Sequence, residues 1–233
     1  MSALIELKRG GGDQFFIWLM AAMFGLVVAL FAFVAATLLA DDEGAGWILV
    51  VLALFTGGLT FIVYREAVAR SFTRIAINWQ TLELRLPAAR GYVPQEKLDT
   101  SIPLASINAI ESRIESYQQF GTTALQFAYS LVLEDGRRIF LGADRRFLTP
   151  YFQNAAGVIS NNIKQPIRDL GLVDGNPGFL LVVGQSAPPW DAAPVPPATM
   201  QKRFKQEASG WRIAWLVTSA ALAIGMIARA FRN

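Results

Sequence analysis

The apolar residues of the chain are concentrated in three blocks, residues 15–40, 47–64 and 213–228, and none of these blocks contains a charged side chain. At about 1.5 Å per residue, the first block exceeds the roughly 30 Å of a hydrocarbon core and predicts a membrane-spanning helix. The second has an aromatic residue at each end, where such rings favour the membrane interface, and predicts a second span. The third is shorter and is bordered by Arg212 and Arg229, whose side chains can extend to the interface. It predicts a C-terminal span, with an in-plane or re-entrant helix as the alternative.

The charges that flank the blocks predict an orientation in the membrane. Lys8 and Arg9 precede the first block and Arg65, Arg70 and Arg74 follow the second, whereas the connector at residues 41–46 carries acidic residues and no basic one. The positive-inside rule therefore places the N-terminal segment, residues 1–14, and the central region in the cytoplasm, and the connector and the C-terminus outside. We predict a multi-pass protein of a bacterial inner, or plasma, membrane. A cleavable signal peptide is the alternative for the first block, although signal cores are only about 7–15 residues long.

Between residues 71 and 170 the apolar spacing changes to the period of two that is typical of half-buried strands. The segments with this character are residues 72–77, 82–86, 107–114, 124–133 and 138–141. The first two predict a hairpin with its turn at residues 78–81, and the third predicts a strand with a bulge. Asp135 and Gly136 form the strongest short hairpin signal and predict the turn between the last two. Residues 88–100 predict a loop or a short edge element.

A helix is predicted to close this region. Thr149 suits the N-cap and Pro150 the first helical position, while Lys164 and Pro166 indicate the end. One face is apolar and consists of Phe152, Ala155, Ala156, Ile159 and Ile163. The predicted order is therefore strands followed by one amphipathic helix.

The hairpin at residues 72–86, the segment 102–107, the hairpin around Asp135 and Gly136 and the closing helix together resemble the bacterial pleckstrin-homology-like domains of small multi-pass membrane proteins. The resemblance covers residues 71–170. It implies a split β-barrel capped by a helix, a fold used for binding rather than catalysis, although fold alone does not set function. In that family the membrane helices usually precede the domain, as two do here, whereas a C-terminal membrane segment is a departure. The predicted fold class is a membrane protein with a helical transmembrane hairpin, residues 15–64, a cytoplasmic α+β domain and a C-terminal transmembrane helix.

The region between the domain and the third block divides into two segments. Residues 175–199 contain six prolines and predict an extended linker, with a short strand at residues 179–183. Residues 200–233 combine a basic juxtamembrane segment with the third block. Residues 200–209 suit a short helix lying on an anionic membrane surface. The alternative is that their positive charge only sets the orientation of the chain in the membrane.

Composition narrows the chemistry that the chain can perform. It contains no cysteine and no histidine, which excludes disulfides, thiol nucleophiles, zinc sites and imidazole bases. The net charge of +3 and a pI of about 9.4 would suit nucleic acid, but the basic residues flank the apolar blocks, so no nucleic-acid partner is predicted. We expect no cofactor, no metal and no enzymatic activity. The clustered carboxylates of residues 41–43 are ligands of the kind that calcium prefers. An acidic external loop is the simpler interpretation.

Two sets of residues are candidates for binding. Small residues spaced for close helix approach are Ala21, Gly25, Gly57, Ala221 and Gly225, with the ordinary alanine and glycine content of membrane helices as the alternative. Basic residues that suit an anionic headgroup are Arg145, Arg146, Lys202, Arg203 and Lys205, with a solvated basic edge as the alternative.

These features predict a non-catalytic accessory, assembly or scaffold subunit of an inner-membrane protein complex. Its expected partners are membrane lipids and another integral membrane protein, and a homo-oligomer is compatible with the pattern. The alternatives are a homo-oligomeric channel or transport component, and an anionic-lipid-binding scaffold. No ionisable residue lies inside the three blocks, which disfavours transporters and proton relays.

Overall fold

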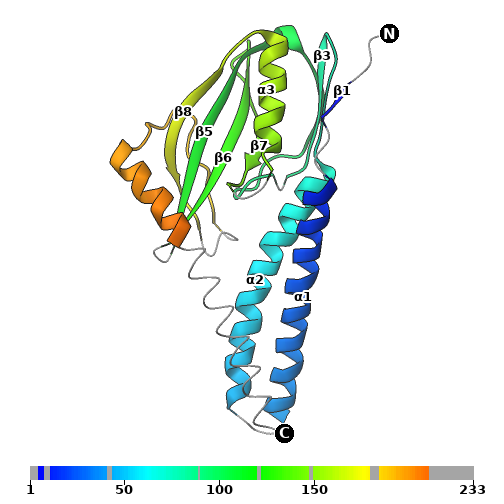
Figure 1. Cartoon of the computed structure of the whole chain (residues 1–233), viewed down its shortest axis with the longest axis vertical. Coiled ribbons are helices and arrows are strands. Elements are labelled where there is room, and N and C mark those ends of the chain that lie inside the picture. The colour runs from blue at the N-terminus through cyan, green and yellow to red at the C-terminus, as the bar shows by residue number, and fades with distance from the viewer. Residues whose placement is uncertain are drawn as a thin grey trace.

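The structure is a computed structural model that describes residues 5–7, 11–40, 44–88, 90–119, 122–146, 149–178 and 184–209. It has two parts, a long helical hairpin and an α+β domain mounted on one end of it (Figure 1). The hairpin consists of α1 (Gly11–Ala40) and α2 (Ala45–Phe72). The connector residues 41–43 and the third apolar block lie outside the described residues.

Both hairpin helices could span a membrane. The apolar stretches Gln14–Ala40 and Gly46–Phe72 have mean hydropathies of 2.6 and 2.3. Their large side chains point outward, and Leu26 and Leu54 are each 73% exposed, so the fold itself does not bury them. The two helices approach closely at Gly46, where an added Cβ would lie 2.6 Å from the Leu39 side chain. This outward apolar surface is what a bilayer would cover.

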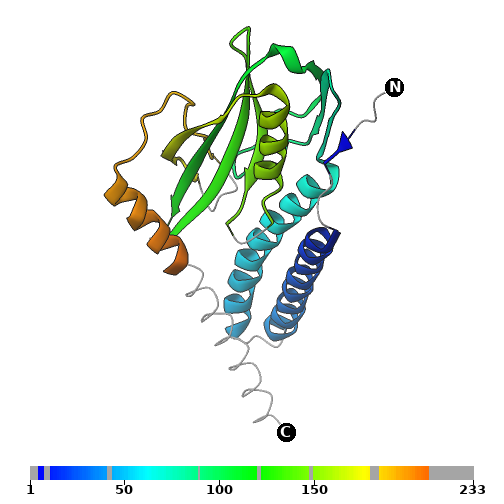
Figure 2. The same cartoon turned by 45° about the horizontal axis from the view of Figure 1, so that its top comes forward.

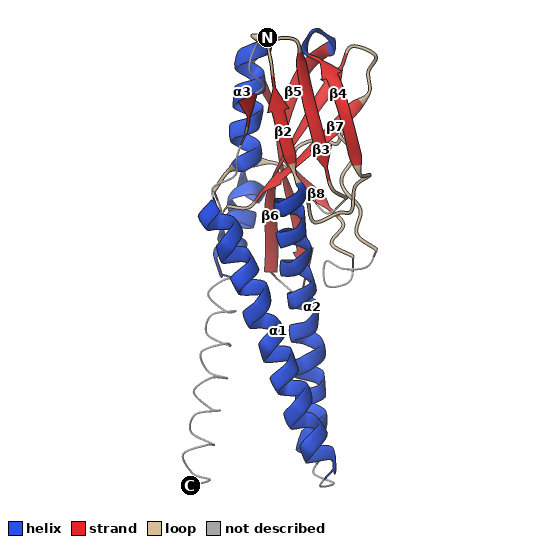
Figure 3. Ribbon diagram, turned by 90° about the vertical axis from the view of Figure 1, so that its right-hand side faces the viewer, coloured by secondary structure: helices blue, strands red, loops and turns tan. Residues whose placement is uncertain are grey.

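In the described residues the domain contains two four-stranded sheets, the helix α3 and a further helix at residues 197–209 (Figures 2 and 3). The first sheet is antiparallel, in the order β1-β2-β3-β4, and comprises β1 (Ile5–Glu6), β2 (Arg74–Ile77), β3 (Thr81–Leu86) and β4 (Leu98–Pro103). A short 3-10 helix, η1 (Leu104–Ser106), leads into the second sheet. That sheet has the order β7-β6-β5-β8 and comprises β5 (Ile107–Gln119), β6 (Thr122–Leu133), β7 (Arg138–Asp144) and β8 (Ile167–Gly175).

The apolar core lies between the two sheets and α3 (Tyr151–Ile163). It takes Leu82, Leu84 and Leu86 from β3, and these residues are at most 1% exposed. From α3 it takes Ala155, Ala156 and Ile159. The buried leucines of β3 and the apolar face of α3 therefore face each other across the core, as the spacing of their apolar residues predicts.

The two predicted hairpins are confirmed. In the first, the side-chain oxygen of Asn78 accepts hydrogen bonds from the backbone N–H groups of Gln80 and Thr81, at 2.8 and 2.7 Å, and this fixes the turn between β2 and β3. In the second, Gly136 has a φ of 83°, which favours glycine, and its N–H donates to the Leu133 carbonyl at 3.0 Å. The bulge in β5 is also confirmed, since the register with β6 shifts between Ile107 and Ala109.

The start of α3 differs from the prediction. Pro150 occupies the N-cap and makes no side-chain cap, and Thr149 makes none of the capping bonds at this end. The buried Asp144, at the end of β7, instead accepts hydrogen bonds from the N–H groups of Tyr151, Phe152 and Gln153, at 3.1, 3.1 and 2.8 Å. A carboxylate suits these free amides and the positive end of the helix dipole. The helix ends as predicted, with Lys164 in the left-handed conformation at the C-cap.

Two strands were not predicted, and the region predicted as a linker is not extended away from the domain. β8 follows α3 and runs parallel to β5, so the domain continues beyond residue 170. β1 precedes α1 and pairs with β2. Within the described part of the proline-rich segment, Ser186 bridges to Asn176 and the Val195 N–H donates to the Leu172 carbonyl at 2.7 Å. The segment therefore lies against β8. The strand predicted at residues 179–183 lies outside the described residues.

Candidate functional site

The end of α2 nearest the domain is polar and is held at several points. α2 continues for eight residues beyond Tyr64 and enters β2 after a single residue, Thr73. The Ser71 hydroxyl accepts hydrogen bonds from the side chains of Gln14 and Trp18 on α1, at 3.0 and 2.9 Å. The Trp18 ring also packs edge-on against Tyr64, with 5.8 Å between centroids. These contacts fix the two helices to each other where they meet the domain.

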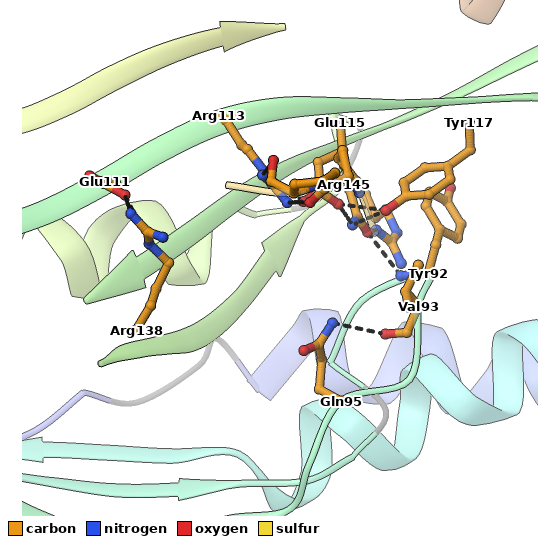
Figure 4. A network of polar contacts seen from close by, with 12 residues as sticks. Tyr92, Val93, Gln95, Glu111, Arg113, Glu115, Tyr117, Arg138 and Arg145 are labelled. Atoms are coloured by element: carbon orange, nitrogen blue, oxygen red, sulfur yellow. Dashed lines mark hydrogen bonds and ion pairs between the residues drawn. The ribbon is translucent and has the colours of Figure 1, made fainter. Parts of the chain in front are cut away.

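A network of buried polar side chains lies on the second sheet (Figure 4) and reaches this helix end through Arg145. Arg145, after β7, donates to Glu66 of α2 at 3.4 Å and to Gln126 of β6 at 2.6 Å. Its guanidinium lies 3.7 Å from the centre of the Tyr92 ring, and the Tyr92 N–H donates to the same Gln126 oxygen at 2.9 Å. Arg145 therefore links the helical hairpin, the loop before β4 and the sheet.

Glu115 of β5 is the centre of the network and is 1% exposed. One of its carboxylate oxygens accepts from Arg113 at 2.6 Å, and the other accepts from the Tyr117 hydroxyl at 2.6 Å. The Gln126 amide also donates to that second oxygen. Every oxygen of this carboxylate is thus hydrogen-bonded, as a buried charge requires.

The same face holds the proline-rich segment against the sheet. Arg113 donates to the carbonyls of Pro188 and Pro189, each at 2.8 Å, and its guanidinium stacks on the Trp190 ring at 3.8 Å. Arg138 of β7 lies 5.2 Å from the same ring and is paired with Glu111 at 2.8 Å. The network therefore extends across the sheet from α2 to Trp190.

The environment shifts several pKa values in this region. Burial raises the pKa of Tyr92 and that of Tyr117, whose neighbour Glu115 raises it further. Burial alone would lower the pKa of Arg145, but Tyr92 and Glu66 beside it raise the pKa above its ordinary value. Burial lowers the pKa of Arg90 to about 10, with partial compensation by Glu96. Arg90 donates to the carbonyls of Pro87 and Phe140, at 2.7 and 2.9 Å, and so anchors the loop before β4.

Alkaline pH is expected to destabilise the domain through its buried tyrosines. Burial, with Asp144 and Asp169 nearby, raises the pKa of Tyr129 from 10.0 to about 12. A raised folded-state pKa gives stability that is present below pH 10 and is lost as the pH rises through about 12. We therefore expect the free energy of unfolding to fall across this window, and to fall less steeply in Tyr129→Phe. Denaturant titrations at a series of pH values measure this, and identical slopes for the two proteins would contradict the assignment.

The charged groups of the network are paired with one another. Glu115 pairs with Arg113 at 2.6 Å, and Glu66 pairs with both Arg70 and Arg145, at 3.0 and 3.4 Å. Among the described residues, no group of three or more acidic side chains lies close enough to hold a metal ion. Mutually satisfied charges of this kind rigidify a junction.

The predicted headgroup ligands are mostly engaged inside the protein. Arg145 lies in the network, Arg146 pairs with Glu207 at 3.3 Å, and Arg203 pairs with Asp174 at 2.9 Å. Burial raises the pKa of Glu207, and Arg146 beside it partly offsets that shift. Lys202 and Lys205 are exposed on the helix of residues 197–209 and make no ion pair within the described part of the chain. The structure therefore does not bring the five predicted cations together.

Of the predicted small residues, Ala21 and Gly57 line one groove of about 470 Å³ on the hairpin. The lining consists of Trp18, Ala21, Ala22, Gly57, Thr60, Phe61 and Tyr64. A Cβ added at Gly57 or at Gly25 would meet no atom within 4 Å, so neither glycine is needed for contact between α1 and α2. Ala221 and Gly225 lie outside the described residues. The helix-packing role of all five residues stays a prediction.

Apart from Arg145, which was predicted as a headgroup ligand, the residues of the network were not predicted from the sequence, but part of the network left a signal. Glu111, Arg113, Glu115 and Tyr117 alternate along β5, so they share one face of the strand. Charged residues on one face and apolar residues on the other would ordinarily indicate a solvated face. Only the buried positions of Arg113 and Glu115 show that this face is covered.

The chain matches no protein-family model, no curated protein and no solved structure. Its function is therefore inferred from its own geometry.

Proposed function

We propose that this protein is a non-catalytic accessory or assembly subunit of a bacterial inner-membrane protein complex, which holds a cytoplasmic binding domain in a fixed position on a membrane hairpin. The observation that carries the proposal is the junction of α2 with the domain. A single residue separates α2 from β2, and the Glu66–Arg145 pair fastens the helix to the second sheet. A flexible tether would suit independent binding, whereas a rigid mount suits assembly with a membrane partner.

The short strand β1 supports the orientation in this proposal. β1 precedes α1 and pairs with β2, which follows α2, so both ends of the hairpin reach the same sheet. The Tyr151 hydroxyl also donates to the Leu7 carbonyl at 3.0 Å. If the hairpin crosses the bilayer, the N-terminal segment and the domain lie on one side. The basic residues at both ends support the cytoplasm as that side, by the positive-inside rule.

The domain is compatible with the pleckstrin-homology-like resemblance. The order of β2 to β7 followed by α3 accords with strands capped by a helix. The parallel strand β8 and the helix of residues 197–209 are additions to that plan. A binding role for the domain therefore rests on its displayed surface rather than on the resemblance.

A pore made by several copies has less support. Thr37, Thr56 and Thr60 supply the polar groups of the described hairpin blocks, and each hydroxyl donates to a carbonyl of its own helix at 2.7–2.8 Å. Bonds of this kind satisfy the hydroxyl locally and leave little polarity for a channel wall. An ion-flux assay on the reconstituted protein tests this, and conductance would reverse the ranking.

Co-purification tests the proposed function. The tagged full chain, extracted from its native membrane in mild detergent and paired with proximity labelling before extraction, is expected to recover the same integral membrane protein in repeated experiments. A lone monomer in detergent, together with no reproducible labelled protein, would refute the accessory role.

Trp79 is the residue of the domain that we expect to contact the partner. It is 67% exposed on the rigid turn fixed by Asn78, and rigid exposed tryptophans are common interface hot spots. Trp79→Ala is expected to reduce recovery of the partner several-fold while changing the free energy of unfolding by no more than about 0.5 kcal/mol. The matched control is Gln80→Ala in the same turn, which should leave recovery unchanged. Equal recovery of the partner with the natural protein, Trp79→Ala and Gln80→Ala would exclude Trp79 from the interface.

A further inference from the structure

The groove on the hairpin is shaped for an apolar helix with small side chains. Its lining is almost entirely apolar, and the Thr60 hydroxyl on its wall already donates to the Thr56 carbonyl at 2.8 Å. Gly57 leaves open space above its backbone. In a bilayer, helices associate by close packing at such small residues rather than by a hydrophobic driving force.

The last described helix, residues 197–209, is tied to the end of α2 through two neighbouring arginines. Arg145 and Arg146 are adjacent, and the first pairs with Glu66 of α2 while the second pairs with Glu207. Glu66 is two residues past Tyr64, where the second apolar block ends, and Glu207 is six residues before Ile213, where the third block begins. One pair of neighbouring arginines therefore ties Glu66, just past the end of the second block, to Glu207, which precedes the third block in the sequence.

The small residues of the blocks also match in depth. At about 1.5 Å per residue, Ala221 would lie ~12 Å into the membrane from Ile213. By the same count, Gly57 lies ~10 Å in from Tyr64, and Ala21 lies ~9 Å in from the start of the first block. By this count Ala21, Gly57 and Ala221 fall at about the same depth.

We propose that the occupant of the groove is the chain's own C-terminal apolar segment, residues 213–228, which packs as a third helix with Ala221 facing Gly57. The inference rests on the proposed C-terminal span. Only three residues separate residue 213 from the helix that ends at residue 209, and so short a connection gives a high effective concentration at the groove. This advantage favours the same chain over a second copy. The segment is also short for a lone span, and packing against other helices is one way a short stretch is accommodated.

Cysteine cross-linking tests the proposal, because the natural chain contains no cysteine. The double variant Gly57→Cys with Ala221→Cys is expressed in the full chain and oxidised in native membranes. A disulfide forms only when the two Cβ atoms approach to about 4 Å. The expected result is a linked peptide, found by mass spectrometry in the monomer band. The control is the double variant Gly58→Cys with Ala221→Cys. Gly58 lies about 100° further around α2 than Gly57 and is not part of the groove lining. This control should cross-link several-fold less.

A second pair guards against a variant that fails to fold. Thr60→Cys with Val217→Cys lies one turn nearer the domain by the same count of residues, and it should also link within one chain. Linked peptides confined to a dimer band would mean that a second copy fills the groove, and would overturn the proposal. No linkage above the control in either pair would overturn it as well. Neither failure bears on the accessory role, which co-purification decides separately.

Discussion

Arg113→Met is expected to lower the free energy of unfolding of the domain by about 3–5 kcal/mol, because it leaves Glu115 charged, buried and unpaired. The two side chains are 1% and 2% exposed and their closest atoms are 2.6 Å apart. Tyr117 and Gln126 would still donate to Glu115, but two neutral donors do not replace a guanidinium. Urea unfolding in detergent, followed by circular dichroism, measures the loss.

Two controls identify the cause of this loss. Arg85→Met removes a strand arginine whose partner, Asp99, is 3.2 Å away, but these side chains are 62% and 65% exposed, so the cost should stay below about 1 kcal/mol. The double variant Arg113→Met with Glu115→Gln removes both charges and should recover part of the stability. Equal losses from Arg113→Met and Arg85→Met would show that the buried pair does not stabilise the domain.

Arg113→Met is also expected to loosen the proline-rich segment. Arg113 donates to the Pro188 and Pro189 carbonyls and stacks on Trp190, whereas Arg85 lies on β3 of the other sheet and pairs with Asp99. Amide hydrogen exchange at Ala192 and Val195 should therefore accelerate in Arg113→Met and not in Arg85→Met. Unchanged exchange would mean that contacts with β8 alone hold the segment.

The parts of the fold that were predictable are those whose signals are local. The two long helices of the hairpin follow from two uncharged blocks, and the turn after β6 follows from Asp135 and Gly136 side by side. β8 was not predictable in this way. Asp169, Gly171 and Asp174 interrupt its apolar pattern, and the segment becomes a strand because it pairs with β5, some 57 residues earlier at Ile110 and Ile167.

The candidate site was missed for the same physical reason. Glu66 and Arg145 are 79 residues apart, and each by itself is an ordinary charge beside an apolar block or after a strand. The cap of α3 shows the effect at shorter range, since Asp144 caps amides seven to nine residues later while the nearby Thr149 does not. Contacts of this kind depend on tertiary structure, which periodicity along the chain does not encode.

Gly142→Ala is expected to destabilise the domain by about 3 kcal/mol, at the upper end of what overpacking of a core costs. Gly142 lies in β7, where the ring of Phe152 from α3 covers it. An added Cβ would lie 2.1 Å from the nearest ring carbon and within 2.5 Å of two others. Phe152 is 3% exposed, so the ring has little room to move without displacing α3.

Gly157→Ala in α3 is the matched control. It adds the same methyl group within the helix that carries Phe152, but at a position where a Cβ meets nothing within 4 Å. Alanine in a helix is favoured over glycine by about 0.5–1 kcal/mol, so this variant should be more stable than the natural protein. The two substitutions are therefore expected to shift the urea midpoint in opposite directions. A shift of the same sign in both would show that α3 does not pack on β7 through Phe152 and Gly142.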